Sequence, residues 1–265
     1  MKHIFILTQF LLATVFLSAQ TFDFNLAKSW DEKPTPHEVH KPYDSSSSVG
    51  ILDERRIEYV TQKDNIFVNA YYHFVVKVMN DKGIETYNKI YIPASENSEI
   101  QNIQARTITS TGKIIQLNAG NIKEIEEDNQ RYKLFALEGL EKGSEVEYSY
   151  TVKRNFSLFG SETFQRTNIP YLHAKFTLIV PSHLKFDVKG YNGYLVSPDS
   201  VIGEQRVIVG YSNDIDEMEE EKYSETDPYL QRVDYKLSYN LVKSPGVRLN
   251  TWKEFAQRTY NYYIS

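Results

Sequence analysis

The stretch Val146-Glu147-Tyr148-Ser149-Tyr150-Thr151-Val152 decides the fold class. Its apolar or aromatic side chains alternate strictly with polar ones, and successive side chains of a β-strand point to opposite faces of a sheet. The stretch therefore predicts a strand with one buried face and one face in water.

Other stretches along the chain are also rich in β-branched and aromatic residues and are separated by turn residues, which is typical of strands. No alternation of strands with helices is visible, so the sequence predicts an all-β fold, an antiparallel β-sandwich with a short C-terminal helix. The other expected strands are 67–79, 84–92, 100–109, 113–117, 174–180, 184–188, 201–211 and 232–241.

Three turn segments are expected to join neighbouring strands into hairpins. Residues 80–83 would join 67–79 to 84–92 with a positive φ at Gly83, and residues 110–112 would join 100–109 to 113–117. Residues 138–143, which include two glycines, would join a further pair.

The C-terminal segment has a different pattern. Pro245-Gly246 ends the last strand, and Thr251 with Glu254 three residues later predicts a capping box at the start of a helix. Apolar and aromatic residues then recur at helical intervals and need a partner surface. We expect Trp252, Phe255 and Tyr260 to contact a following domain that is missing from this chain.

The N-terminal segment predicts export. A basic start is followed by an apolar run over 4–17 and by the small and polar residues 18–20, so residues 1–20 are interpreted as a signal peptide. The run is shorter than the roughly 20 apolar residues of a membrane span, so no span is expected after cleavage. Residues 21–48 contain three prolines and a serine run, which predicts an extended lead-in with little core.

Composition limits the class of protein further. The chain has 265 residues, a formal net charge of -5 and no cysteine. Acidic and basic residues are interspersed, which argues against a nucleic-acid partner. A cysteine-free exported chain has neither a disulfide nor a lipidated cysteine, and this favours a bacterial periplasm or cell surface.

No residue is assigned a catalytic, cofactor-binding or metal-binding role. His37 and His40 stand three apart, but nearby prolines oppose a helix and no further ligand joins them, so they are interpreted as exposed linker residues. The acidic stretch 213–221 lacks the glycine turn of a calcium loop and is expected to be solvated. His73, His173 and His183 are interpreted as surface or packing residues, and most of the 20 tyrosines as residues of half-buried strands.

The order of these features resembles the DUF3857 domain, which precedes a transglutaminase-like domain in exported bacterial proteins. The most specific segment is Leu137-Glu138-Gly139-Leu140-Glu141-Lys142-Gly143-Ser144, which enters the strand at Tyr148. The resemblance also rests on Val49-Gly50-Ile51-Leu52-Asp53 before Ile57-Glu58-Tyr59, on residues 80–87, on Ala105-Arg106 before Ser110-Thr111-Gly112-Lys113, and on Ile169-Pro170-Tyr171. We assign residues 49–242 to this domain, and residues 243–265 to a linker and the start of a truncated transglutaminase-like domain.

The resemblance implies a cysteine nucleophile with histidine and aspartate partners in that downstream domain, and a chain without cysteine cannot hold this nucleophile. Our leading hypothesis is a non-catalytic module that docks on the downstream domain and positions a protein, peptide or glycan substrate. The alternative is a free-standing glycan- or protein-binding module of the cell envelope. A third hypothesis, an enzyme that uses two carboxylates as acid and base, has no spacing in its favour.

Overall fold

The computed structural model describes residues 30–39, 43, 45–63, 65–219 and 225–264. The chain divides into two compact units, 1–33 and 34–265. Only residues 30–33 of the first unit are described, so the expected signal peptide 1–20 lies outside the described residues. The fold below is that of the second unit.

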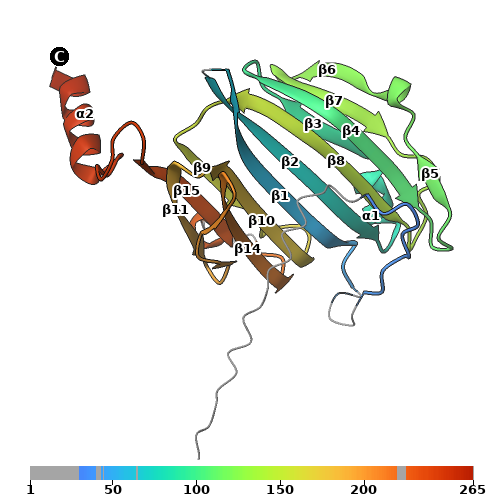
Figure 1. Cartoon of the computed structure of the whole chain (residues 1–265). Helices are drawn as coiled ribbons and strands as arrows, with labels where there is room; N and C mark the ends of the chain where they lie inside the picture. Colours follow the sequence, from blue (N-terminus) through green and yellow to red (C-terminus); the bar gives the residue numbers. More distant parts are fainter. Residues whose placement is uncertain (1–29, 40–42, 44, 64, 220–224, 265) are drawn as a thin grey trace, which may run out of the picture. The chain divides into compact units, whose positions relative to one another are not determined.

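One large mixed sheet forms the body of this unit, with the strand order β12-β14-β10-β1-β2-β8-β4-β5, and β13 also pairs with β14 (Figure 1). All pairs in it are antiparallel except β1 with β10, which run parallel, so the expectation of a purely antiparallel sheet is corrected at this pair. Its strands are β1 (Ser48–Gln62), β2 (Asn65–Val78), β4 (Ser98–Ile108), β5 (Ile114–Gln116), β8 (Glu145–Asn155), β10 (Tyr171–Pro181), β12 (Leu195–Val196), β13 (Ser200–Ile202) and β14 (Gln205–Ile215).

Two three-stranded sheets form a divided second layer on one face of the large sheet. One has the order β11 (Leu184–Tyr191), β15 (Arg232–Asn240), β9 (Phe159–Thr163), and the other β3 (Lys89–Ala94), β7 (Gln130–Ala136), β6 (Lys123–Glu127). Phe176, Phe186 and Tyr235 belong to the core under the first small sheet. Val146 and Phe135 belong to the core under the second. The fold is therefore an all-β sandwich, as predicted, with its second layer in two pieces.

The opposite face of the large sheet holds a third apolar cluster, and part of the lead-in contributes to it. Tyr43 is buried there against Val49, Ile51 and Val75, and Val39 packs on the cluster. The expectation of little core in 21–48 is therefore wrong for this part of the segment. The reason is that the large sheet has apolar side chains on this face as well, and they need cover.

Residues 80–83 do not form a hairpin turn. They begin the helix α1 (Asp81–Tyr87), whose N-cap Asn80 accepts a hydrogen bond from the Gly83 N–H at 3.2 Å. Gly83 does not have a positive φ. A Cβ at this position would lie 2.1 Å from the Ser47 carbonyl oxygen, so close backbone approach is what requires glycine here.

Two further expectations about strand pairing need correction. The turn 138–143 joins β7 to β8, but these two strands do not pair with each other. β7 pairs with β3 in a small sheet, whereas β8 pairs with β2 and β4 in the large sheet. The expected strand 201–211 is a hairpin of β13 and β14, since Gly203 has a φ of +60° and turns the chain back. The hairpin of β4 and β5 is confirmed, with Gly112 at a φ of +82°.

The strand β8 alternates as predicted, but its polar side is not in water. Glu147, Ser149 and Thr151 are buried, whereas Tyr148 and Tyr150 are only half-buried. The polar side chains are covered because long side chains of neighbouring strands bond to them, such as those of His73 and Arg106 to Glu147. Buried polar groups are tolerated when they are hydrogen-bonded in this way.

Candidate functional site

The helix α2 (Trp252–Ile264) begins with the predicted capping box. The Glu254 N–H donates to Thr251 Oγ1 at 3.3 Å, and the Thr251 N–H donates to Glu254 Oε2 at 2.7 Å. These two bonds satisfy N–H groups that the first turn of a helix leaves without a partner. The backbone hydrogen bond from Thr251 also lowers the pKa of Glu254.

The chain just before α2 is fixed to the first small sheet. The Leu249 N–H donates to the Ser238 carbonyl at 2.8 Å, and Asn250 Nδ2 donates to the Leu237 carbonyl at 3.0 Å. Leu249 also packs on the core under this sheet. The helix itself has no buried residue, so it is held at its first end only.

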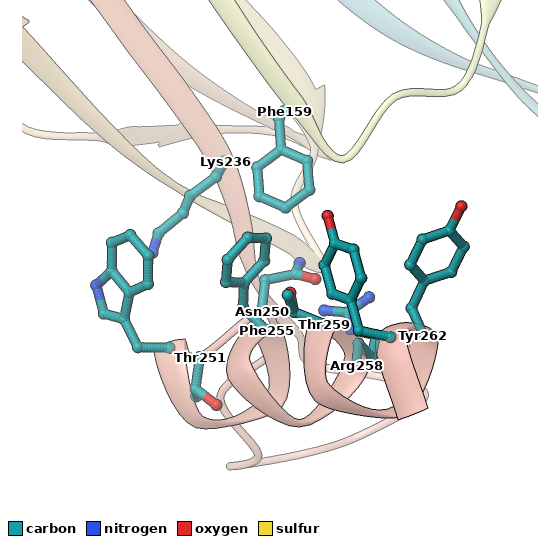
Figure 2. A pocket seen from close by; sticks show the side chains of 10 residues that line it. Phe159, Lys236, Asn250, Thr251, Phe255, Arg258, Thr259 and Tyr262 are labelled. Carbon is teal, nitrogen blue, oxygen red and sulfur yellow. The ribbon is translucent and has the colours of Figure 1, made fainter. Parts of the chain in front are cut away.

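A groove of about 930 Å³ lies between α2 and the edge of the first small sheet. In Figure 2, Phe255 and Tyr262 project from the helix to the side where Phe159 of β9 lies. We call this the C-terminal groove; it is lined by Phe159, Lys236, Asn250, Thr251, Trp252, Phe255, Arg258, Thr259, Tyr262 and Tyr263. Trp252 is 82% exposed and Phe255 57%, so large aromatic surface faces solvent here.

A second groove of about 830 Å³ continues over the outer face of the same small sheet, and Trp252 lines both grooves. Residues of β15 alternate there: Val233 and Tyr235 are buried, while Arg232, Asp234 and Lys236 point outward. The Arg232 guanidinium lies 4.4 Å from the centre of the Tyr191 ring, an attractive cation–π contact. Aromatic residues and arginine are enriched at protein interfaces.

The structure brings together two of the three residues expected to contact another domain. Trp252 and Phe255 line the C-terminal groove, and their rings are in edge contact with centroids 5.9 Å apart. Tyr260 is 60% exposed but does not line the groove. Eight positions after Trp252, at 3.6 residues per turn, it points more than a fifth of a turn away from it.

Sequence analysis missed several residues of this surface. Tyr262 follows Phe255 by seven residues, so helical spacing alone could have found it. Phe159 and Lys236 come from distant strands, and no sequence signal places them beside the helix.

The other sequence candidates are dispersed. His37 is exposed, as expected, but its Nδ1 lies 2.9 Å from Oε2 of the fully buried Glu145. His173 Nδ1 contacts Asn213 Oδ1 at 2.8 Å, and His73 is buried in the large sheet.

The acidic stretch 213–221 is only partly described. Its first residue, Asn213, belongs to β14 rather than to a loop, and the end of the stretch, like His40, lies outside the described residues. Among the described residues, no group of three or more potential ligands could hold a metal ion.

The fold and this surface define an all-β module with a divided second layer and an exposed aromatic helix. The family model of the domain of unknown function DUF3857 matches residues 68–219, more than half of the chain. The chain belongs to the DUF3857 family. No helix in the described ranges has the length and apolar character that crossing a membrane requires.

The solved structures that match this chain are distant from it in sequence. A crystal structure of a "putative protease" from Parabacteroides distasonis ATCC 8503 matches with a TM-score of 0.63 and 11% identity over 71% of this chain. An M1 zinc metallopeptidase from Deinococcus radiodurans matches 71% of the chain with a TM-score of only 0.40 and 8% identity. The chain spans 40% and 42% of the lengths of these two proteins. No curated protein sequence matches the chain.

Proposed function

We propose that this chain is an exported, non-catalytic module that docks on a transglutaminase-like, papain-like cysteine domain and positions a substrate for it. The exposed aromatic stripe of α2 is the observation that carries this proposal. Burial of a large aromatic side chain stabilises an interface strongly, and tryptophan is prominent among residues that dominate binding energy. The stripe is held beside the C-terminal groove without being buried by it.

Two further observations support the docking role. The DUF3857 family model covers most of the described sandwich, and the chain spans 40% of the similar structure named as a protease, so the shared fold is one part of that longer protein. The present chain contains no cysteine and cannot itself supply a thiolate. We place the module in the bacterial periplasm or at the cell surface, on the basis of the N-terminal sequence pattern.

The experiment has two steps. The first reads the gene beyond the Ser265 codon, where the proposal expects a cysteine, then a histidine and an aspartate. The second titrates the present chain with that downstream domain, made as a separate polypeptide, by isothermal calorimetry. Trp252→Ala combined with Phe255→Ala should weaken binding by more than about tenfold, because hot-spot aromatics contribute 2 kcal/mol or more.

Tyr260→Ala is the matched control, since Tyr260 is an exposed tyrosine of the same helix outside the groove. It should leave the affinity within about twofold of the unmodified chain. Equal affinity of the Trp252/Phe255 variant and the unmodified chain would exclude α2 as the docking element.

The second candidate is a free-standing glycan- or protein-binding module. A separate pocket on the large sheet favours a glycan as the ligand of such a module. This second candidate function requires no partner domain.

A further inference from the structure

The division of the second layer leaves part of the large sheet uncovered by either small sheet. A pocket of about 260 Å³ lies there, with Phe74 of β2 and Tyr148 and Tyr150 of β8 among its lining residues. Tyr87 of α1 packs against the cores of both small sheets, so the pocket lies where the two cores meet. We call this the tyrosine pocket.

Five tyrosines line the pocket, and their hydroxyl groups have no hydrogen-bond partner among the described residues. They are Tyr87, Tyr91, Tyr148, Tyr150 and Tyr171. Within the described part of the chain, none of these hydroxyls makes a hydrogen bond, and none is among the side-chain atoms sealed from solvent without a partner. A tyrosine hydroxyl can both donate and accept a hydrogen bond, so tyrosines that line the pocket can bond to a polar ligand.

The hydroxyl groups of Tyr87, Tyr150 and Tyr171 remain protonated near neutral pH. Burial raises the pKa of Tyr87 and of Tyr150 to about 12, and it raises the pKa of Tyr171 as well. The phenols therefore act as neutral donors and acceptors and bring no negative charge to the pocket.

The rings of Tyr148 and Tyr150 stack on aromatic rings of a neighbouring strand. Tyr148 stacks on Phe74 with ring centroids 5.0 Å apart, and Tyr150 stacks on Tyr72 at 5.1 Å. These stacked pairs connect β8 to β2, two neighbouring strands of the large sheet. A pre-organised aromatic wall lowers the entropy cost of binding.

Arg166 and Asn168, in the segment between β9 and β10, add nitrogen donors to the pocket. Arg166 Nη2 lies 3.6 Å from Asp53 Oδ2, but both Asp53 oxygens accept 2.8 Å hydrogen bonds from Arg55. Arg55 also donates to Glu162, so two arginines face two carboxylates and the formal charges cancel. The side chain of Arg166 is 41% exposed, which leaves its guanidinium accessible to a ligand.

We propose that the tyrosine pocket binds one pyranose ring of a glycan. A pyranose offers apolar C–H faces to aromatic rings and hydroxyl groups around its rim, which match the two kinds of lining group. The pocket is smaller than the roughly 300–1,000 Å³ of most small-molecule sites, so it suits one ring better than an extended peptide. A free amino acid would need a carboxylate for its ammonium group, and the lining residues include none.

The test uses the full chain and four probes: glucose, galactose, N-acetylglucosamine and N-acetylgalactosamine, with the peptide tri-alanine as the competing class. Saturation-transfer NMR and calorimetry should show binding of at least one sugar, with a Kd of about 1–10 mM. Tyr150→Phe and Arg166→Ala should each weaken that binding about tenfold or more.

Two controls separate binding from folding. Tyr150→Phe removes a hydroxyl that has no partner among the described residues and keeps the ring, so its Tm should stay within about 1 °C of the unmodified chain. Tyr91→Phe, at a residue that is 46% exposed, provides a second variant if Tyr150→Phe fails to fold. Tyr260→Phe, outside the pocket, should bind sugar normally.

Three results would overturn the inference: no sugar binds, the pocket variants bind as well as the unmodified chain, or tri-alanine binds in place of the sugars. The inference is independent of docking through α2. The Trp252→Ala, Phe255→Ala double variant should therefore keep its sugar affinity, whatever happens to its affinity for a partner domain.

Discussion

His73 Nε2 on β2 lies 2.8 Å from Glu147 Oε1 on β8, and both side chains are buried. The other oxygen of Glu147 accepts a hydrogen bond from Arg106 Nε at 2.7 Å, and His73 Nδ1 lies 3.9 Å from Glu54. Lys175 contacts Glu54 at 3.0 Å. A row of alternating charges therefore crosses the large sheet from β10 to β4.

This row predicts a pH-dependent stability. Burial lowers the pKa of His73, but hydrogen bonds and charges of Glu147 and Glu54 outweigh it and raise the pKa above 6.5. The protonated histidine then stabilises the native state fully below pH 6.5, and this contribution is lost as the pH rises through the folded-state pKa. Urea unfolding should show that the His73→Gln variant loses less stability than the unmodified chain between about pH 5 and about pH 9.

His183→Gln is the control for that measurement, because the described chain shows no side-chain hydrogen bond or ion pair of His183. Parallel curves of unfolding free energy against pH for His73→Gln and the unmodified chain would rule out the contribution of His73.

On the acid side, burial opposes ionisation of Glu54, but His73 and Lys175 lower its pKa from 4.5 to about 2. Its contribution is present above pH 4.5 and is lost as the pH falls through about 2.

Asp53→Asn should cost about 3–5 kcal/mol of unfolding free energy, because removing one charge of a buried pair leaves the other without compensation. Asp53 is fully buried and holds Arg55 through two 2.8 Å hydrogen bonds. Glu124→Gln, in a surface pair with Lys133, should cost much less, because exposed ion pairs contribute little to stability. Denaturant unfolding of both variants measures these costs. A cost for Asp53→Asn as small as that of Glu124→Gln would contradict the predicted contribution of the buried pair.

Gly83→Ala should destabilise the protein by about 1–3 kcal/mol, since the new Cβ must displace backbone. The contact is with the carbonyl oxygen of Ser47, 2.1 Å from the position of that Cβ. Lys82→Ala changes an exposed residue of the same helix and should stay within about 0.5 kcal/mol of the unmodified chain. Thermal unfolding compares the two variants, and equal midpoints would show that the backbone yields at Ser47 without cost.

Gly83 also illustrates the limit of sequence reasoning about this fold. Alternation of apolar and polar residues predicted most strands, because that pattern is local and β-strands have a period of two. Which strands pair depends on contacts distant in sequence, so Asn80 with Gly83 was interpreted as a hairpin turn when they begin α1. The same reason hides the parallel pairing of β1 with β10.

In the candidate surfaces too, features formed by residues close in sequence were predictable, and features formed by distant residues were not. The capping box and the stripe of α2 were predictable because Thr251, Glu254, Trp252 and Phe255 are neighbours in the sequence. Phe159 enters the C-terminal groove from β9, and the tyrosine pocket draws its lining from β2, α1, β3, β8, β10 and the segment before β10. The sequence predicts most tyrosines to be strand residues, which is correct for Tyr148 and Tyr150, but only the divided second layer leaves a pocket that these two residues line.

The helix α2 should be the least protected of the helices and strands named above in hydrogen exchange. A helix of 13 residues is marginal in water unless its apolar face is packed, and α2 has no buried residue. Its backbone amides over 255–262 should therefore exchange with opening free energies near zero, whereas those of β8 around Tyr148 should approach the global unfolding free energy. Thr251→Ala removes the capping hydroxyl and should weaken the helix by about 0.5–2 kcal/mol without changing exchange in β8. Slow exchange of residues 255–262, equal to that of the Tyr148 strand, would mean that α2 is already packed on the sandwich, and docking through its aromatic stripe would lose its structural basis.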